Sequence, residues 1–398
     1  MKRVGNWHQR GLSRMIPLFK VGMSGDASAR VAETLQSGYI GQGPRVEEFE
    51  SALRKELGIQ NLLTVNSGTS ALHLALHLLK RPASGEGFHG IWPGLQPGDE
   101  VLATPLTCTA TNWPVLGNGL ELRWVDVDPN NANMSLDDLK QKLSSRTKVI
   151  LLVHWGGYPV DLDALGRILD EATPHLGFRP MVIEDCAHAW KSTYKNRFIG
   201  SHGNLAAFSF QAIKHLTCGD GGLLVTPNTD LFKRGKLLRW YGIDRDDPRG
   251  DFRCENDVPE WGFKFHMNDI SATIGLSNLE FADRAVEQHR DNAKFYNSVL
   301  QNTPGVELLE NATDRLSSYW IYTIKVSRRE DFRRKLSESG IMVSQVHERN
   351  DKHSTVESYR SFLPQLDSII DKIICIPVGW WVDEIARNHI ADTIKSGW

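Results

Sequence analysis

The stretch LAAFSFQAIKHLTCGDGG, residues 205–222, joins an apolar run, a lysine at position 214 and a glycine-rich turn. The run at 205–210 has the length and composition of a buried strand, and GLLVT at 222–226 predicts a second strand after the turn. One lysine among 46 basic residues is ordinarily a solvated surface group. A lysine directly after a buried strand is instead placed to be partly buried and deprotonated, as an amine that forms a Schiff base must be.

Five further apolar runs precede this stretch, and each has the length of a strand. They are LLTV at 62–65, EVLAT at 100–104, LRWVDV at 122–127, VILLV at 149–153 and MVIED at 181–185. Segments with helical periodicity separate them, at 71–80, 135–143 and 161–172. Alternating strands and helices are typical of an α/β sandwich around a mostly parallel sheet.

The pattern changes after residue 227. From about 228 to 262 the chain is polar and rich in Gly, Pro and Asp, which predicts a long irregular excursion, and such loops are usually functional. A helical stretch follows at 267–300, and YWIYTIKV at 319–326 predicts a strand. We therefore expect a large domain at 15–264 and a smaller C-terminal α+β domain at 265–398.

The composition limits the classes of function. The 398 residues include 46 Lys and Arg against 48 Asp and Glu, so the net charge of −2 gives no whole-protein case for binding nucleic acid or a membrane surface. Five cysteines without a C-x-x-C pair, and the lack of a long apolar run, predict a cytoplasmic protein. His347 and Glu348 begin an H-E-x-x-H zinc motif, but residue 351 is Asp, and we predict no metal site.

Two other strand ends carry polar side chains suited to chemistry. The strand at 62–65 runs into NSGTSALHLAL, which places Gly68, Thr69 and Ser70 in the first turn of a helix, where free N–H groups favour a phosphate. The alternative is that these side chains only cap a buried helix. The strand at 181–185 ends in EDCAHA, so Asp185 can face a ligand bound beyond the sheet edge.

Alternative roles also exist for the residues of EDCAHA. Asp185 could cap a loop, and His188 could be a core histidine with satisfied hydrogen bonds. A phosphate site, an acid after one strand and a lysine after another are, however, the parts that a pyridoxal 5'-phosphate (PLP) site needs. The three strand ends together therefore predict a PLP enzyme.

The order and spacing of these motifs resemble the fold type I, PLP-dependent nucleotide-sugar aminotransferases of the DegT/StrS type, from about residue 16 to the C-terminus. Five motifs in family order carry the resemblance: SGYIGQGPRVEEFE at 37–50, VNSGTSALHLAL at 65–76, VIEDCAHA at 182–189, FSFQAIKHLTCGDGG at 208–222 and GFKFHMNDISATIGL at 262–276. The resemblance implies a large domain with a mostly parallel central sheet in an α/β/α sandwich, plus a smaller C-terminal α+β domain.

The resemblance also implies roles for individual residues. Lys214 matches the lysine that forms the Schiff base with PLP and shuttles a proton. Asp185 matches the acid that keeps the pyridine nitrogen protonated, and His188 takes the position beside the phenolic oxygen. Thr69, Ser70 and Ser209 match the phosphate ligands, and Gly68 in the same turn lets the backbone approach the cofactor.

Two matched positions carry further expectations. Lys264 falls where many relatives carry Asn or Lys that reaches the phosphate in the neighbouring subunit, which implies a homodimer with shared active sites. Cys108 takes a position where the family usually places an aromatic residue or His over the cofactor ring. Either the thiol packs against the ring or another aromatic side chain reaches in, and Trp113 is close in sequence.

The function implied by the resemblance is transfer of an amino group, from an amino acid such as L-glutamate, to the keto carbon of a nucleotide-linked keto-deoxysugar, in a ping-pong cycle through pyridoxamine phosphate. The runner-up is a PLP-dependent sugar dehydratase, whose relatives replace the Schiff-base lysine with His. Here Lys214 holds the position and His215 is next to it. A non-catalytic regulator of the same fold predicts loss of Lys214 or Asp185, and both are present.

The excursion at 240–256 also predicts a contact with the substrate. Its Trp240, Tyr241, Arg245 and Arg253 could hold a diphosphate, because arginine pairs well with phosphate oxygens. The alternative is a solvated surface loop. The sequence leaves the nucleotide, the sugar and the aminated carbon open.

Overall fold

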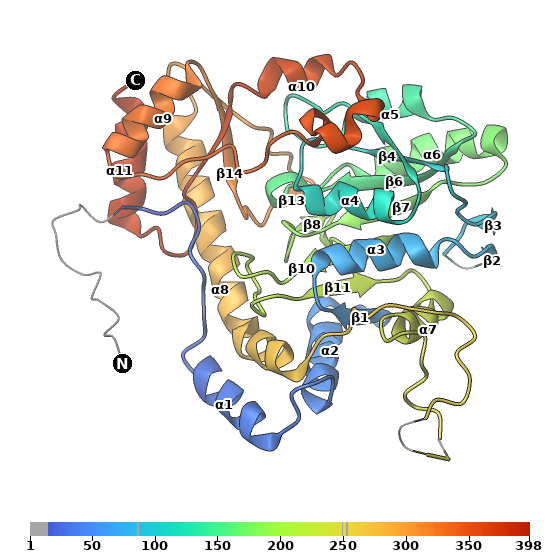
Figure 1. Ribbon diagram of the computed structural model, residues 1–398. Coiled ribbons are helices and arrows are strands. Elements are labelled where there is room, and N and C mark those ends of the chain that lie inside the picture. Colours follow the sequence, from blue (N-terminus) through green and yellow to red (C-terminus); the bar gives the residue numbers. More distant parts are fainter. Residues whose placement is uncertain (1–14, 86, 249, 252–253) are drawn as a thin grey trace.

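One mixed sheet crosses the larger part of the molecule (Figure 1). The computed structural model describes residues 15–85, 87–248, 250–251 and 254–398. The order of the strands is β1 (Leu62–Val65), β11 (Gly222–Val225), β10 (Leu205–Ser209), β7 (Met181–Asp185), β6 (Thr147–Val153), β4 (Glu100–Ala103) and β5 (Glu121–Trp124). The last five are parallel, and β11 is antiparallel to both neighbours. Each strand lies within one of the apolar runs or extends it by a residue or two, so the predicted sheet is confirmed.

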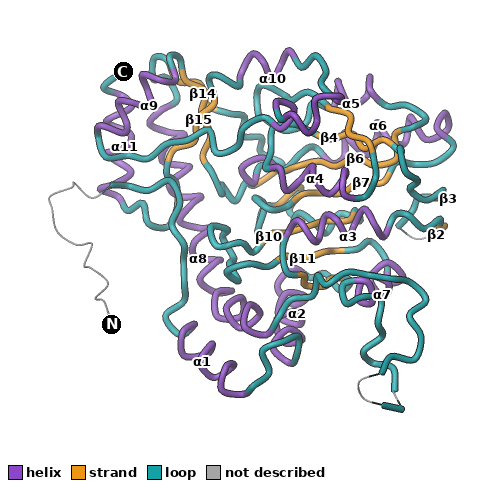
Figure 2. Tube along the Cα trace, viewed as in Figure 1, coloured by secondary structure: helices purple, strands orange, loops and turns teal. Residues whose placement is uncertain are grey.

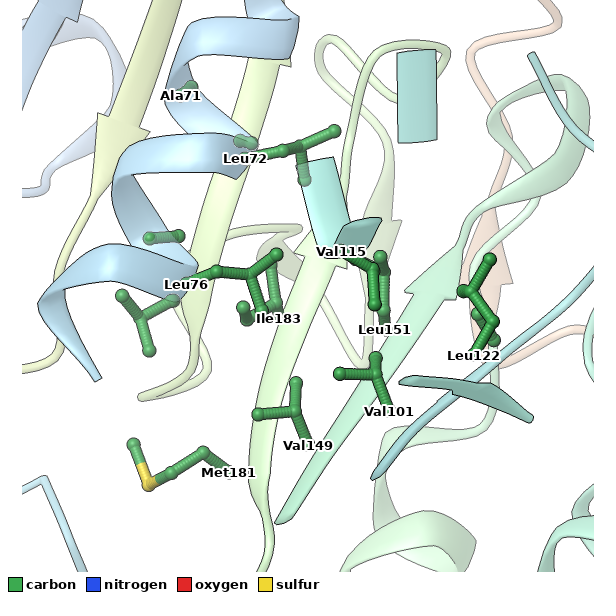
Figure 3. Close-up of a cluster of buried hydrophobic side chains, with 14 of the residues drawn as sticks. Ala71, Leu72, Leu76, Val101, Val115, Leu122, Val149, Leu151, Met181 and Ile183 are labelled. Atoms are coloured by element: carbon green, nitrogen blue, oxygen red, sulfur yellow. The ribbon is translucent and has the colours of Figure 1, made fainter. Parts of the chain in front are cut away.

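Helices cover both faces of this sheet, and the strands bury side chains on each. The helices on one face are α3 (Gly68–Leu78), α4 (Thr109–Gly117) and α7 (Thr229–Leu238). Figure 3 shows this core, where Leu76 of α3 lies beside Ile183 of β7 and Val115 of α4 lies beside Leu151 of β6. The helices on the other face are α2 (Pro44–Leu57), α5 (Leu136–Lys142), α6 (Leu162–Leu176) and the first half of α8 (Asp269–Leu300). The three layers explain why the strands are continuous apolar runs rather than alternating ones.

A second, smaller core lies at the far end of α8. Its antiparallel sheet has the order β12 (Val306–Leu308), β14 (Tyr322–Val326) and β15 (Ile373–Ile376), and its other helices are α9 (Arg329–Glu338) and α11 (Glu384–Lys395). Between β14 and β15 the chain returns to the larger core, where α10 (Pro364–Ile369) buries Leu366. Because the chain crosses back in this way, the boundary at residue 265 stays a prediction.

Several short elements complete the described chain. The helix α1 (Ala27–Ser37) packs beside α8, as Figure 2 also shows. The remaining elements are η1 (Trp155–Gly157), η2 (Asn350–Lys352), η3 (Ser354–Tyr359), β2 (Ala83–Gly85), β3 (Gly90–Trp92), β8 (Thr193–Tyr194), β9 (Arg197–Phe198) and β13 (Arg315–Leu316). In the described ranges, no helix combines the length and the apolar character that crossing a membrane requires.

The prediction that the chain is irregular from residue 228 onward is wrong for residues 229–238. There α7 forms, because the side chain of Asn228 accepts a hydrogen bond from the N–H of Leu231 and because Leu231 and Leu238 are buried. The described part of 239–262 contains neither a helix nor a strand, as predicted. Arg253 lies outside the described residues.

Candidate active site

The carboxyl ends of three parallel strands bring the predicted site residues to one edge of the sheet. The strand β7 ends at Asp185 and its neighbour β10 ends at Ser209, and Asp185 pairs in register with Ala207. β1 runs in the same direction as β10, because both are antiparallel to the strand β11 between them, and it leads into α3 at Gly68. This edge is where open α/β sheets bind their ligands.

Gly68 and Gly222 allow the turn at 66–70 to lie against the neighbouring strands β10 and β11 at this edge. A Cβ on Gly68 would lie 2.9 Å from the Cβ of Ser209, and a Cβ on Gly222 would lie 2.4 Å from the carbonyl oxygen of Ser67. A side chain at Gly68 would therefore push the turn at 66–70 away from the end of β10, and one at Gly222 would push it away from the start of β11. The two glycines keep the N-terminus of α3 against Ser209.

The turn at 66–70 satisfies part of its own hydrogen-bonding capacity. Ser67 caps α3, because its hydroxyl accepts a 3.0 Å hydrogen bond from the N–H of Ser70, and the Ser70 hydroxyl donates 2.6 Å to Asn66 Oδ1. The N–H groups of Gly68 and Thr69 belong to the first helical turn, where no carbonyl inside the helix can accept from them. The cap thus uses the N–H of Ser70, whereas the N–H groups of Gly68 and Thr69 have no acceptor inside the helix.

Asp185 is a buried carboxylate at the end of β7. Its Oδ2 accepts a 2.7 Å hydrogen bond from the hydroxyl of Thr111, and its Oδ1 accepts a 3.0 Å bond from the N–H of Ala187. Burial raises the pKa of Asp185, while these hydrogen bonds and the charge of Lys214 act in the opposite direction. A cation beside this carboxylate would therefore be strongly favoured.

Lys214 lies in the loop that follows β10. Its Nζ is 3.5 Å from the ring centroid of Trp320. Burial lowers the pKa of Lys214 to about 8, although Asp185 and Cys108 favour the charged amine. Near neutral pH such an amine is present in both its charged and its neutral form.

His188 is buried beside Lys214 with one ring nitrogen unused. Among the described residues its Nδ1 has no hydrogen-bond partner, and its ring stacks on Trp320 at 4.0 Å and 21°. The ring of His347 lies parallel to it at 5.5 Å. Burial, together with the charge of Lys214, holds the pKa of His188 well below its usual range, so the ring is neutral.

Cys108 and Trp113 lie at and inside α4. Cys108 is the N-cap residue, its side chain makes no capping hydrogen bond and it is partly exposed. Trp113 packs edge-on against His353 at 5.8 Å. The ring face next to Lys214 belongs to Trp320 rather than to Trp113.

Lys264 lies beside the turn at 66–70 of its own chain. Its carbonyl oxygen accepts a 3.2 Å hydrogen bond from Asn66 Nδ2, and the N–H of Asn66 donates 2.7 Å to the carbonyl oxygen of Phe265. The side chain of Lys264 is exposed. An exposed cation at the rim of the turn suits an anion site, and its reach into a second subunit stays a prediction.

A separate cavity of about 330 Å³ lies under the loop that follows α7. Arg239, Trp240 and Arg245 line it together with residues of α2, whereas Lys214 does not. The guanidinium of Arg245 stacks on Trp240 at 4.5 Å and donates to the carbonyl oxygen of Gln42. The contact between this loop and a substrate diphosphate therefore stays a prediction, because within one chain the loop lines a cavity that Lys214 does not reach.

The donor set fits PLP. It contains an amine with a lowered pKa, a buried carboxylate that favours a cation, a buried ring nitrogen without a partner, and helix N–H groups suited to a phosphate. Sequence reasoning missed Thr111, Trp320 and His347. Thr111 follows Cys108 closely in the motif TPLTCTATN, but Trp320 and His347 lie far along the chain.

The fold and this donor set define a PLP-dependent enzyme of the α/β class, and comparisons with known proteins specify the family. Residues 23–395 match the DegT/DnrJ/EryC1/StrS aminotransferase family. The chain belongs to this family. The resemblance noted from the sequence is therefore confirmed.

Relatives and solved structures agree with this membership. The chain is 33% identical to the spore coat polysaccharide biosynthesis protein SpsC of Bacillus subtilis (strain 168), covering 75% of this chain and 73% of that protein. It is 31% identical to GDP-perosamine synthase of Escherichia coli O157:H7, covering 82% of each. Its structure is similar to AtS13 from Actinomadura melliaura (TM-score 0.91, 53% identity, 98% of this chain and 100% of that chain) and to the sugar aminotransferase CalS13 from Micromonospora echinospora (TM-score 0.90, 49% identity, 96% and 100%).

The chain is thus a PLP-dependent sugar aminotransferase, which confirms the predicted fold class, cofactor and transamination of a nucleotide-linked sugar. The substrates are that sugar and an amino donor. The roles of individual residues, the identity of the donor and the dimer stay predictions.

Proposed function

We propose that the chain moves an amino group from L-glutamate to the keto carbon of a nucleotide-linked keto-deoxysugar, with Lys214 as the residue that holds PLP and carries the proton. The observation behind this proposal is the convergence of Lys214 and the buried Asp185 at the ends of adjacent parallel strands. Bound PLP supplies an electron sink for the negative charge that develops when a proton leaves the carbon next to the transferred nitrogen.

Asp185 would hold the protonated ring nitrogen. Burying a carboxylate without a cation costs free energy, so a positively charged group beside Asp185 is favoured. The Thr111 hydroxyl donates to one carboxylate oxygen and the N–H of Ala187 to the other, and together they fix the plane of the carboxylate. His188, neutral and with Nδ1 unused, can accept or donate a hydrogen bond at the phenolic oxygen without adding charge.

Lys214 would act as base and then as acid. With a pKa of about 8, its amine takes up a proton and gives it back at little cost near neutral pH. The N–H groups of Gly68 and Thr69 and the hydroxyl of Ser209 would bind the phosphate at the start of α3. Ser70, matched with them to the phosphate, also supports the turn through the hydrogen bond that its hydroxyl donates to Asn66 Oδ1.

The same proposal includes a homodimer in the cytoplasm with shared active sites. Lys264 is exposed at the rim of the phosphate turn, which leaves its ammonium free to reach a second copy. In a two-fold dimer each subunit would lend Lys264 to its partner and receive the partner's in return.

Isotope transfer tests the proposed function. The purified protein is incubated with L-glutamate labelled with ¹⁵N at the amino group and with a panel of nucleotide-linked keto-deoxysugars, and the sugar product is analysed by mass spectrometry. We expect ¹⁵N on the sugar and release of 2-oxoglutarate. A deoxygenated sugar without nitrogen would instead identify the dehydratase of the same fold.

Matched lysine variants test the role of Lys214. Lys214→Ala should abolish transfer, because it removes the amine that moves the proton. Lys140→Ala is the control, since Lys140 lies on the surface of α5 and its ammonium bonds Glu171 there. Transfer that survives in Lys214→Ala would overturn the assignment.

A further inference from the structure

Three hydrogen bonds hold the short segment Ser317–Trp320 next to the candidate site residues. The hydroxyl of Ser318 donates to the carbonyl oxygen of His188 at 2.9 Å. His289 on α8 bonds the carbonyl oxygen of Tyr319 at 2.8 Å, and the Trp320 Nε1–H donates to the carbonyl oxygen of Ile213 at 2.9 Å. The segment is therefore tied to the residue before Lys214 and to His188 itself.

The backbone of this segment is strained where it directs Trp320 into the site. Tyr319 has a φ of 50°, in the left-handed region that side chains other than glycine rarely adopt. Such a conformation persists only when surrounding contacts hold it, and it is concentrated at functional positions. The hydrogen bonds at Ser318, Tyr319 and Trp320 supply that hold.

Trp320 contacts two candidate site residues through its ring. Its buried indole stacks on His188 at 4.0 Å, and the Lys214 Nζ lies 3.5 Å from its centroid. Phe19 stacks on Trp320 at 5.1 Å and leaves little room for the ring to shift. An ammonium over a tryptophan face is attracted to the π electrons, more strongly when water is excluded.

We propose that Trp320 is a positioning residue for the transamination, whose ring face holds the free amine of Lys214 and fixes the plane of His188. This inference rests on the proposed role of Lys214 as the cofactor lysine. The chain must free this amine in each half-reaction and must then return its proton to a defined carbon. A ring face that holds the ammonium keeps it at the site instead of letting the side chain turn away.

The test measures the titration of the Lys214 amine in variants of Trp320. The full chain, both without cofactor and after loading with pyridoxamine 5'-phosphate, is trace-labelled with isotope-coded acetic anhydride across a pH series. The peptide that contains Lys214 is then quantified by mass spectrometry. The titratable groups near the amine are Asp185, Cys108, His188, His215 and His347, and all are unchanged in the variants.

Trp320→Leu removes the π face, so the pKa of Lys214 should fall by roughly half a unit or more in both forms of the protein. Trp320→Phe keeps a smaller aromatic face and should give a smaller fall. Trp92→Phe is the matched control, because Trp92 is equally buried and its Nε1–H donates to a backbone carbonyl, that of Leu79, at 2.8 Å. It should leave the Lys214 titration unchanged.

Fluorinated tryptophan gives a second test that does not depend on whether Trp320→Leu folds. Ring fluorination withdraws π density with little change of shape, and Trp320 is the tryptophan whose ring face the structure places at Lys214. Protein made with fluorotryptophan should show the same direction of shift. Wild-type titration of Lys214 in both Trp320→Leu and the fluorinated protein, or an equal shift in Trp92→Phe, would overturn the inference.

These outcomes are separable from the failure of the proposed function. The labelling depends neither on the sugar nor on the amino donor, so a shifted Lys214 titration supports the role of Trp320 even if no tested sugar accepts nitrogen. Conversely, ¹⁵N transfer with an unshifted titration would support the proposed function and reject this role.

Discussion

Consecutive carboxyl groups at the end of β7 face opposite sides of the sheet, and their environments differ. Glu184 accepts hydrogen bonds from His154 Nε2 at 2.9 Å and from Asn204 Nδ2 at 2.7 Å. The N–H of Val160 donates to His154 Nδ1, which leaves the proton on Nε2 and directs it to Glu184. Asp185 faces Thr111 and the candidate cofactor site.

The two groups also have opposite pKa shifts. Burial alone would raise the pKa of Glu184, but the hydrogen bonds from His154 and Asn204 lower it overall. For Asp185, burial dominates and raises the pKa despite its two hydrogen bonds. Hydrogen bonds within the fold thus stabilise the charge of Glu184, whereas the charge of Asp185 is left destabilised by burial. The second pattern is the one expected of a functional residue, which supports the prediction for Asp185.

The largest expected effect is on catalysis by Asp185→Asn. The amide oxygen can still accept from the N–H of Ala187, and the amide NH2 can donate to the Thr111 hydroxyl, but the neutral amide cannot stabilise a protonated ring nitrogen. We expect the transamination rate to fall on the order of a hundredfold or more, the size seen when a group that stabilises developing charge is removed. Steady-state kinetics with glutamate and the sugar acceptor measure it. A kcat of Asp185→Asn close to that of the wild type would contradict the proposal that Asp185, unlike Glu184, takes part in the reaction.

Glu184→Gln should affect stability more than chemistry. Glutamine has a single acceptor oxygen, so one of the two hydrogen bonds loses its charge-assisted character and the other loses its acceptor, which costs about 1 to 3 kcal/mol of unfolding free energy. Urea unfolding measures the loss, and activity at saturating substrate should stay within a few-fold of wild type. A large fall in kcat at unchanged stability would place Glu184 in the reaction and erase the contrast with Asp185.

The pH dependence of stability should differ in sign between these two variants. The folded pKa of Glu184 is depressed, so its stabilisation is present above the unfolded pKa near 4.5 and is lost as pH falls through the folded value. Asp185 has a raised folded pKa, so its ionisation lowers stability as pH rises above 3.8.

Urea unfolding of the cofactor-free proteins between about pH 3 and 7 measures this difference. Relative to wild type, Glu184→Gln should lose stability as pH rises, whereas Asp185→Asn should gain it. Parallel curves for the two variants would contradict the opposite shifts.

The smallest expected effect is that of Thr111→Val, which removes one hydroxyl donor from Asp185 at nearly constant volume. Because that hydrogen bond lowers the pKa of Asp185, its loss should raise the pKa further. The acid limb of kcat/KM should then move to higher pH by up to about one unit. A pH profile with the limb unmoved would show that Thr111 does not tune this carboxyl.

Much of the fold follows from local patterns in the sequence. The seven strands of the main sheet are apolar runs bounded by polar or glycine-rich turns, and burial on both faces makes such runs distinct. The helix α7 was missed because its sequence TDLFKRGKLL carries three basic residues and a glycine, although Leu231 and Leu238 bury one face. The hairpin of β2 and β3 is too short and glycine-rich for a periodic signal.

Some residues of the candidate site could likewise be predicted from the sequence, and others could not. Asp185 ends one strand and Lys214 follows the neighbouring one, so their meeting at one edge could be predicted from the rule that parallel strands end together. Trp320 could not, because its position depends on a turn with Tyr319 in the left-handed region and on contacts with α8. No local pattern encodes contacts across more than a hundred residues.

The helix α8 has a mechanical consequence for how substrates enter. Its 32 residues form one continuous rod of roughly 48 Å that packs against α1 and α2 at one end and against α11 in the smaller core at the other. Swinging the two cores apart would require this rod to bend or to lose contacts at one end. We therefore expect the framework to behave as one stiff body, with access to the lysine governed by the loops at the sheet edge.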